Sequence, residues 1–132
     1  MKFRDFNDLK MFNERLSYRE IDNLEKRLDE LFSKINMDVE FTTHLRERIL
    51  KRDVSESELS STFIKLYNKY NKILKKDEFS ALVFDIGTYL NLPIKVEWKP
   101  VKKEFNLYVI TAIKTDDTRK PVATHGRKLL EV

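Results

Sequence analysis

Cysteine is absent from this 132-residue chain, so neither a disulfide nor a thiolate metal site can form. No apolar run approaches the roughly 18 residues that a membrane-spanning helix needs. The first six residues carry too much charge for a secretory signal. We therefore expect a protein without membrane segments that acts in the cytoplasm.

Composition and charge limit the partner classes. Hydrophobic residues make up 41% of the chain and charged residues 36%, a balance typical of a soluble protein, here of one domain spanning 1–132. Residues 1–65 hold 13 Lys/Arg against 14 Asp/Glu, whereas residues 66–132 hold 13 against 8. The basic second half suits a polyanionic partner such as nucleic acid.

Hydrophobic spacing divides the chain into a helical half, 1–76, and a sheet half, 79–132. Ser17 with Glu20 has the spacing of a capping box at the start of a helix. Residues 37–42 are expected to form a connector. The expected helices cover about 4–15, 18–35, 43–52 and 55–75.

After residue 78 the hydrophobic period becomes that of strands. Apolar residues alternate with polar ones over 92–99, and a nearly continuous apolar run covers 105–113. The last residues, 129–132, could add an edge strand. Helices followed by an antiparallel sheet over about 79–132 indicate the α+β class.

The short helix expected over 43–52 carries an unusual row of side chains. His44, Arg48 and Arg52 are four residues apart, so they share one face of a helix. Histidine commonly exchanges protons near neutral pH, and arginine can grip a phosphate through its planar fork. The alternative interpretation is a set of ordinary solvated side chains on a short basic helix.

The segment 43–54, T-H-L-R-E-R-I-L-K-R-D-V, resembles the core of the RegB-type phage endoribonucleases, which belong to the wider RelE/YoeB-like ribonuclease fold. The shared pattern is a histidine, a leucine, an acidic–arginine pair, a second arginine four residues on, a hydrophobic residue and a capped helix. The likeness covers 40–75 by motif and 79–132 by architecture alone. It implies a location in the host cytoplasm if a phage encodes the chain.

The resemblance also implies roles for individual residues. His44 would be a catalytic or RNA-contacting histidine, Arg48 would bind the scissile phosphate, and Arg52 would be a supporting cation or the partner of an acid. The family uses a second histidine on the following helix, where this chain has Ile64. Either His125 fills that place, or the protein is a weak nuclease, or it no longer cleaves RNA.

The chemistry expected from this row needs no metal ion and no cofactor. A base removes the proton of a ribose 2′-hydroxyl, cations stabilise the charged phosphorane, and an acid protonates the leaving 5′ oxygen. The products would be a 2′,3′-cyclic phosphate and a 5′-hydroxyl. The expected partner is RNA, as mRNA free or on the ribosome.

Other basic and aromatic residues are weaker candidates. His125 precedes Gly126, and an exposed loop histidine is the favoured interpretation. Trp98 and Tyr108 could stack on bases, although strand spacing favours a place in the core. The lysines are either solvated surface residues or a track for the RNA backbone; the candidates are Lys51, Lys95, Lys99, Lys102 and Lys103.

Two other classes of function stay open from the sequence. A binding module could use the same cationic row to hold RNA or the ribosome without cleaving. A small phage structural or protein-interaction protein could instead use the charged helix of residues 18–35 to pair with a partner, and the His/Arg row would then be incidental.

Overall fold

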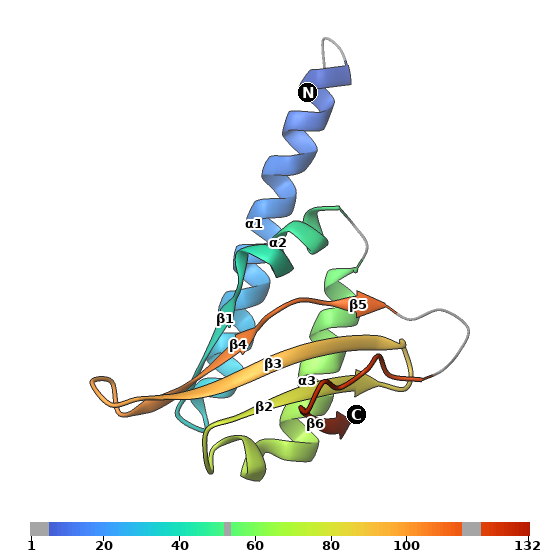
Figure 1. Cartoon of the computed structure of the whole chain (residues 1–132). Coiled ribbons are helices and arrows are strands. Elements are labelled where there is room, and N and C mark those ends of the chain that lie inside the picture. The colour runs from blue at the N-terminus through green and yellow to red at the C-terminus, as the bar shows by residue number, and fades with distance from the viewer. Residues whose placement is uncertain (1–5, 52–53, 115–119) are drawn as a thin grey trace.

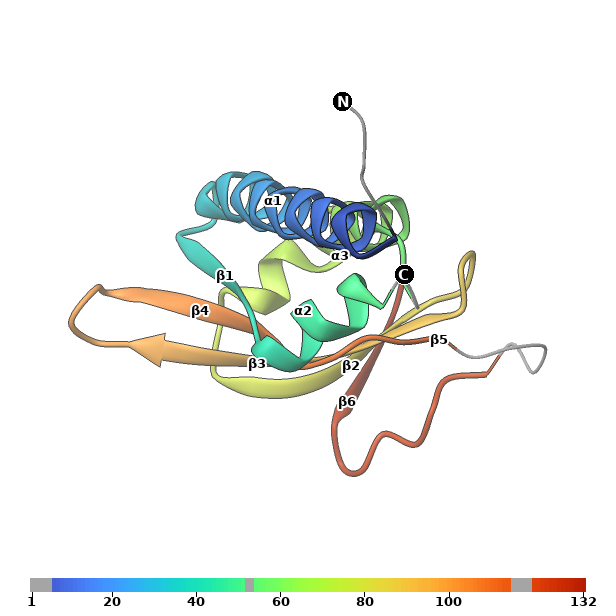
Figure 2. The same ribbon diagram turned by 90° about the horizontal axis from the view of Figure 1, so that it is seen from above.

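A computed structural model describes residues 6–51, 54–114 and 120–132, with side chains from residue 18 onward. Three helices lie on one face of a six-stranded sheet (Figures 1 and 2). This arrangement confirms the predicted α+β class. In chain order the elements are α1 (Phe6–Ser33), β1 (Met37–Phe41), α2 (Thr43–Leu50), α3 (Glu56–Leu74), β2 (Phe79–Asp85), β3 (Leu90–Lys99), β4 (Glu104–Val109), β5 (Ile113–Lys114) and β6 (Lys128–Glu131).

The sheet is mixed rather than purely antiparallel. Its strand order is β1-β4-β3-β2-β6, with β5 paired to β3. The central strands β2, β3 and β4 pair antiparallel as expected, but β1 pairs parallel with β4 and β6 pairs parallel with β2. Parallel neighbours need a long crossover connection, and here α2 and α3 lie between β1 and β4.

Helix α1 corrects the prediction of two helices at 4–15 and 18–35. It runs without a break from Phe6 to Ser33, and neither proline nor glycine occurs within it. Ser17 therefore lies inside the helix and does not cap it, because a capping box acts only where the preceding backbone is not helical. Residues 4 and 5 of the first predicted helix lie outside the described residues.

Strand β1 replaces the connector expected there. Met37, Val39 and Phe41 are buried, whereas Asp38 and Glu40 point to the other face and are more exposed. This is the period-2 alternation of a strand with one buried face. Over only five residues the pattern was too short to be distinguished from a connector.

The outer edge of β1 is covered by carboxylates of α1. The Val39 amide donates a hydrogen bond of 2.9 Å to Asp29, and the Phe41 amide donates one of 2.8 Å to Glu25. An edge strand left with free amides is prone to pair with another chain. Helix α1 thus closes this edge through side chains and not through another strand.

The two shorter helices agree with their predicted ranges. Helix α3 begins after Ser55, whose hydroxyl accepts the Glu58 amide at 3.1 Å, as the capping-box spacing predicts. Helix α2 ends at Leu50 with Lys51 as its C-cap, slightly before the expected end at 52. None of the described helices is long and apolar enough to cross a membrane.

Candidate active site

Helix α2 is anchored at its start and along one side. The Thr42 hydroxyl caps the helix by accepting the Leu45 amide at 3.3 Å, and it donates a 2.6 Å hydrogen bond to the Ile110 carbonyl beyond the end of β4. Leu45 and Ile49 are buried in the core beneath α1. Because these contacts use one side of α2, its other side is turned outward.

The outward side of α2 carries two members of the predicted row, His44 and Arg48. His44 is exposed and Arg48, one helical turn later, is half-buried. Four residues of helix advance about 6 Å, so one phosphodiester could contact both side chains. Lys51 is exposed at the C-cap, and the exposed Glu47 supplies one negative charge on the same side. Arg52 lies outside the described residues.

Arg46, which points to the opposite side of α2, holds the helix against α1. Its guanidinium donates to Asp22 at 2.8 Å and to Glu25 at 2.9 Å. Partial burial opposes its charged form, but the hydrogen bond to Asp22 and the two carboxylates outweigh this and raise the pKa of Arg46. Sequence reasoning missed this positioning residue, because its partners lie more than twenty residues earlier in the chain.

The structure does not bring His125 to the α2 row. His125 is exposed in a turn just before β6, with a positive φ of 50°, as the exposed-loop interpretation predicts. Strand β6 forms one edge of the sheet, whereas β1, which leads into α2, forms the opposite edge. Figure 2 likewise shows the segment before β6 on the side of the sheet away from the helices.

Ile64 also faces a different surface. Its side chain is 47% exposed and lines an open hollow of about 540 Å³ beside α1 and α3, where Arg27 and three serines also contribute. No member of the α2 row is among the described residues that line this hollow. Tyr67, one turn further along α3, packs its ring edge-on against Phe32 at 5.5 Å in the core.

The lysines of β3 lie on the sheet face away from the helices, which we call the open face. Glu97 binds Lys95 at 2.8 Å and Lys99 at 3.1 Å, and the ring of Tyr108 lies 5.3 Å from the Lys99 ammonium. The hydrogen bonds of this cluster raise the pKa of both lysines and lower the pKa of Glu97. Half of the positive charge that these two lysines would offer to an RNA track is therefore offset.

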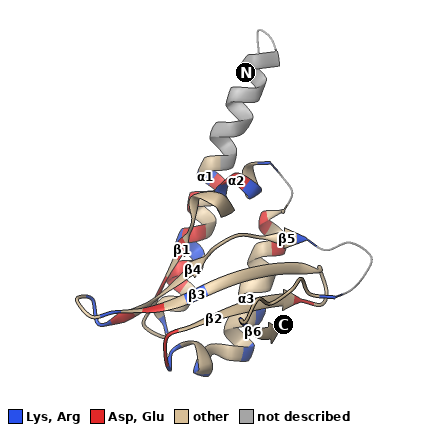
Figure 3. Cartoon of the chain, viewed as in Figure 1, with Lys and Arg blue, Asp and Glu red and all other residues tan. Residues whose placement is uncertain are grey.

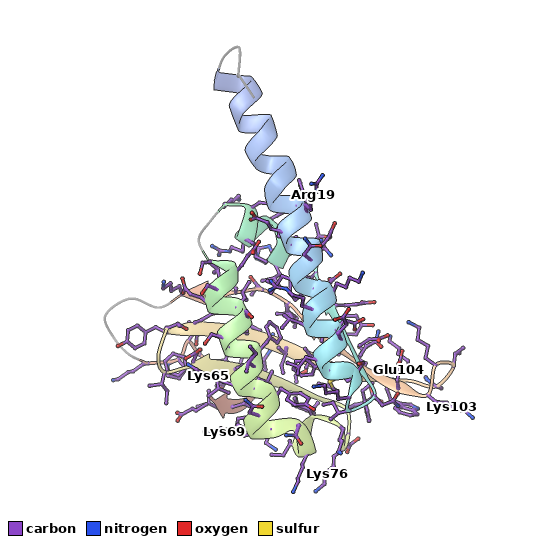
Figure 4. All side chains as sticks on the ribbon, turned by 180° about the vertical axis from the view of Figure 1, so that it is seen from behind. Arg19, Lys65, Lys69, Lys76, Lys103 and Glu104 are labelled. Carbon is purple, nitrogen blue, oxygen red and sulfur yellow. The ribbon has the colours of Figure 1, made fainter. Side chains whose placement is uncertain are left out.

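The remaining lysine candidates lie at the tip of the β3–β4 hairpin. Lys102 pairs with Asp38 at 3.6 Å, and Lys103 has a positive φ of 53° in the turn. Figure 4 shows Lys103 beside Glu104 at this tip, remote from α2. Figure 3 shows acidic and basic residues interleaved along these strands. The structure thus groups only Lys51 with the His/Arg row.

Trp98 corrects the expectation of a core aromatic. It is 40% exposed, although its ring packs against Phe105 with centroids 4.9 Å apart. The β3–β4 hairpin extends past the helices, so no second layer covers this end (Figure 1). Tyr108 is half-buried on the open face.

The described side chains contain no group of three histidine or carboxylate residues able to hold a metal ion. No protein-family model, curated protein or solved structure matches this chain. The geometry of α2 is therefore the main indication of what this protein does.

Proposed function

We propose that this protein is a metal-independent RNA endonuclease that cleaves by attack of a ribose 2′-hydroxyl. The supporting observation is the outward placement of His44, one helical turn from Arg48, on a helix that is anchored by buried side chains and a capped start. This arrangement offers a proton acceptor and a phosphate-binding cation to one solvent-facing site.

In this proposal His44 accepts the 2′-hydroxyl proton and Arg48 binds the non-bridging phosphate oxygens. Arginine can contact two of these oxygens at once, which a lysine cannot do in the same geometry. Arg52 adds a second positive charge, and Lys51 binds a neighbouring phosphate of the RNA chain. The products are a 2′,3′-cyclic phosphate and a 5′-hydroxyl.

The leaving 5′ oxygen takes its proton from water in this proposal. His125 lies by the opposite edge of the sheet, and Ile64 cannot transfer a proton. A positioned general acid is typically worth about 10²–10⁴ in rate. We therefore expect slow cleavage, measured under single-turnover conditions with enzyme in excess.

The test uses an end-labelled RNA incubated with the protein in EDTA. We expect fragments that end in 2′,3′-cyclic phosphate, and no cleavage at a position where the ribose is replaced by 2′-deoxyribose. Arg48→Ala should slow cleavage by about 10²–10³, whereas Arg48→Lys should retain part of the rate. Cleavage that requires magnesium, or that proceeds at a deoxyribose, would exclude this mechanism.

A non-catalytic RNA-binding function is the second candidate. It is favoured by the lack of a second histidine among the described residues that the structure groups with His44 on α2. In that case the same assay would return intact RNA bound in a salt-sensitive complex, and Arg48→Ala would weaken binding.

A further inference from the structure

The described segment 120–127 crosses the open face of the sheet before it enters β6, and we call it the C-terminal strap (Figures 1 and 2). Leu82 and Phe84 alternate with the helix-facing residues of β2 and so point to the open face, yet they are only 1% and 2% exposed. The strap lies on this side of β2 in both views. It therefore accounts for the burial of these two side chains.

A buried amide holds the strap in place. Asn91 of β3 is fully buried, and its Oδ1 accepts the Val122 amide at 3.0 Å. Its Nδ2 lies 3.3 Å from the carbonyls of both Tyr89 and Ile113. A buried amide with these partners would leave polar groups unsatisfied if the strap moved away, so the strap has a defined position.

The strap ends in a tight turn that projects into open space. The Arg127 amide donates to the Thr124 carbonyl at 3.0 Å, and His125 and Gly126 have φ values of 50° and 82°. Apart from Gly126 itself and its two chain neighbours, no described residue has an atom within 4 Å of the place where a Cβ on Gly126 would stand. The turn is therefore accessible to a ligand from outside.

Positive charge gathers on and beside the strap. Lys120, Arg127 and Lys128 occur in a stretch, 120–130, that contains no Asp or Glu. Within the described part of the chain, none of the three is within ion-pair distance of a carboxylate. The lysines of β3 differ, because both pair with Glu97, which offsets one of their two charges.

We propose that the C-terminal strap is a second contact surface for the backbone of single-stranded RNA, with Lys120 and Arg127 binding its phosphates. Lys128, which shares the helix-facing side of β6 with the buried Leu130, binds a phosphate where the RNA passes this edge of the sheet. The identification of the polyanion as RNA rests on the proposed function. Strand β1, which leads into α2, lies four strand spacings from β6, or about 19 Å. The strap also lies on the sheet face opposite to α2 (Figure 2). An RNA cut at α2 must therefore pass around an edge of the sheet and extend over several nucleotides to reach the strap, so the strap selects long RNA.

The experiment compares the parent with a triple variant, Lys120→Gln, Arg127→Gln and Lys128→Gln. Binding is measured with an RNA whose 2′-hydroxyls are methylated. Cleavage is measured with two substrates, a long RNA and a dinucleotide. Three lost phosphate contacts should reduce the slope of log K against log salt by about 2. The enzyme concentration that gives half-maximal single-turnover cleavage of long RNA should rise about tenfold at an unchanged limiting rate, whereas dinucleotide cleavage should not change.

A matched control removes three charges elsewhere. Lys72, Lys75 and Lys76 are exposed around the end of α3, and Figure 4 marks Lys76 there. Their replacement by glutamine changes the net charge by the same amount without touching the strap. We expect this control to lower the salt slope by much less than the strap variant does.

Unchanged binding of methylated RNA by the strap variant would overturn the inference, as would an equal loss in the control. If RNA binding depends on the strap but no RNA is ever cut, the nuclease proposal fails and the strap proposal stands. If the parent binds no RNA, both fail.

Discussion

Arg46 of α2 and Glu25 of α1 form an ion pair 2.9 Å long, and the same carboxylate also accepts the Phe41 amide at 2.8 Å. One glutamate thus joins the helix that carries the candidate active site to both α1 and the edge strand β1. The orientation of His44 and Arg48 depends on this junction, because Arg46 lies on the same short helix.

Removal of Arg46 should therefore affect both stability and activity. We expect Arg46→Ala to lower the free energy of unfolding by about 1–2 kcal/mol, since a charged hydrogen-bonding network is lost. Asp22→Ala should cost less than about 0.5 kcal/mol, because the Asp22 side chain is 67% exposed. Urea unfolding of both variants, followed by circular dichroism, makes the comparison, and an equal loss would contradict the assigned role of Glu25.

The contrast between Arg46 and His44 shows what sequence reasoning could reach. The His44–Arg48 spacing is local, and a capped amphipathic helix turns such residues to one side, so the outward row was predictable. The partners of Arg46 come from a different helix, and no local period indicates that pairing. The parallel placement of β1 depends in the same way on a crossover, which hydrophobic alternation alone does not specify.

Asp85 should make stability depend on pH in the acid range. It is buried, and although burial opposes its charge, hydrogen bonds from Thr62, Lys65 and the Gly87 amide lower its pKa below the ordinary value of 3.8. A carboxyl with a depressed folded-state pKa contributes stability above its unfolded-state pKa and loses it as the pH falls through the folded-state value.

Asp85→Asn should therefore remove part of the acid-induced loss of stability below about pH 4. At neutral pH the same variant should be less stable by about 2–3 kcal/mol, because Lys65 loses its buried partner. Urea midpoints measured from pH 7 down to pH 3 give both quantities. A variant with parental stability at pH 7 would show that this network does not stabilise the fold.

The cap of α2 offers a conservative test of how the site is held. Thr42→Val keeps the shape of the side chain but removes the hydroxyl that contacts Leu45 and Ile110. We expect a loss of about 1 kcal/mol in unfolding free energy together with slower RNA cleavage. Thr42→Ser should keep both near parental values. An activity loss of equal size in the serine variant would argue against the hydroxyl as the cause.

Removal of the Asp29 carboxylate from the edge of β1 should allow this strand to pair with another chain. Asp29→Ala leaves the Val39 amide without its hydrogen-bond partner, and an edge strand with free amides favours pairing between chains. We expect more concentration-dependent association by light scattering in this variant than in the parent. Asp22→Ala removes an acid from the same helix without touching β1, and it should remain like the parent.

The positions of the other candidates could not be derived from the sequence, for a physical reason. The lysines at 95 and 99 alternate along β3 as an RNA track would require, but Glu97 lies between them on the same face, pairs with both and offsets one of their two charges. The covering of one part of that face by the C-terminal strap depends on the buried Asn91, a contact between segments about thirty residues apart.

The most direct measurement is the single-turnover cleavage rate of a labelled RNA in EDTA by His44→Ala and His125→Ala. Both residues are exposed histidines, so each change removes the same chemical group from the surface. The account predicts a fall of about 10²–10⁴ for His44→Ala and little change for His125→Ala. A folded His44→Ala variant that cleaves at the parental rate would contradict the assignment of the active site to α2.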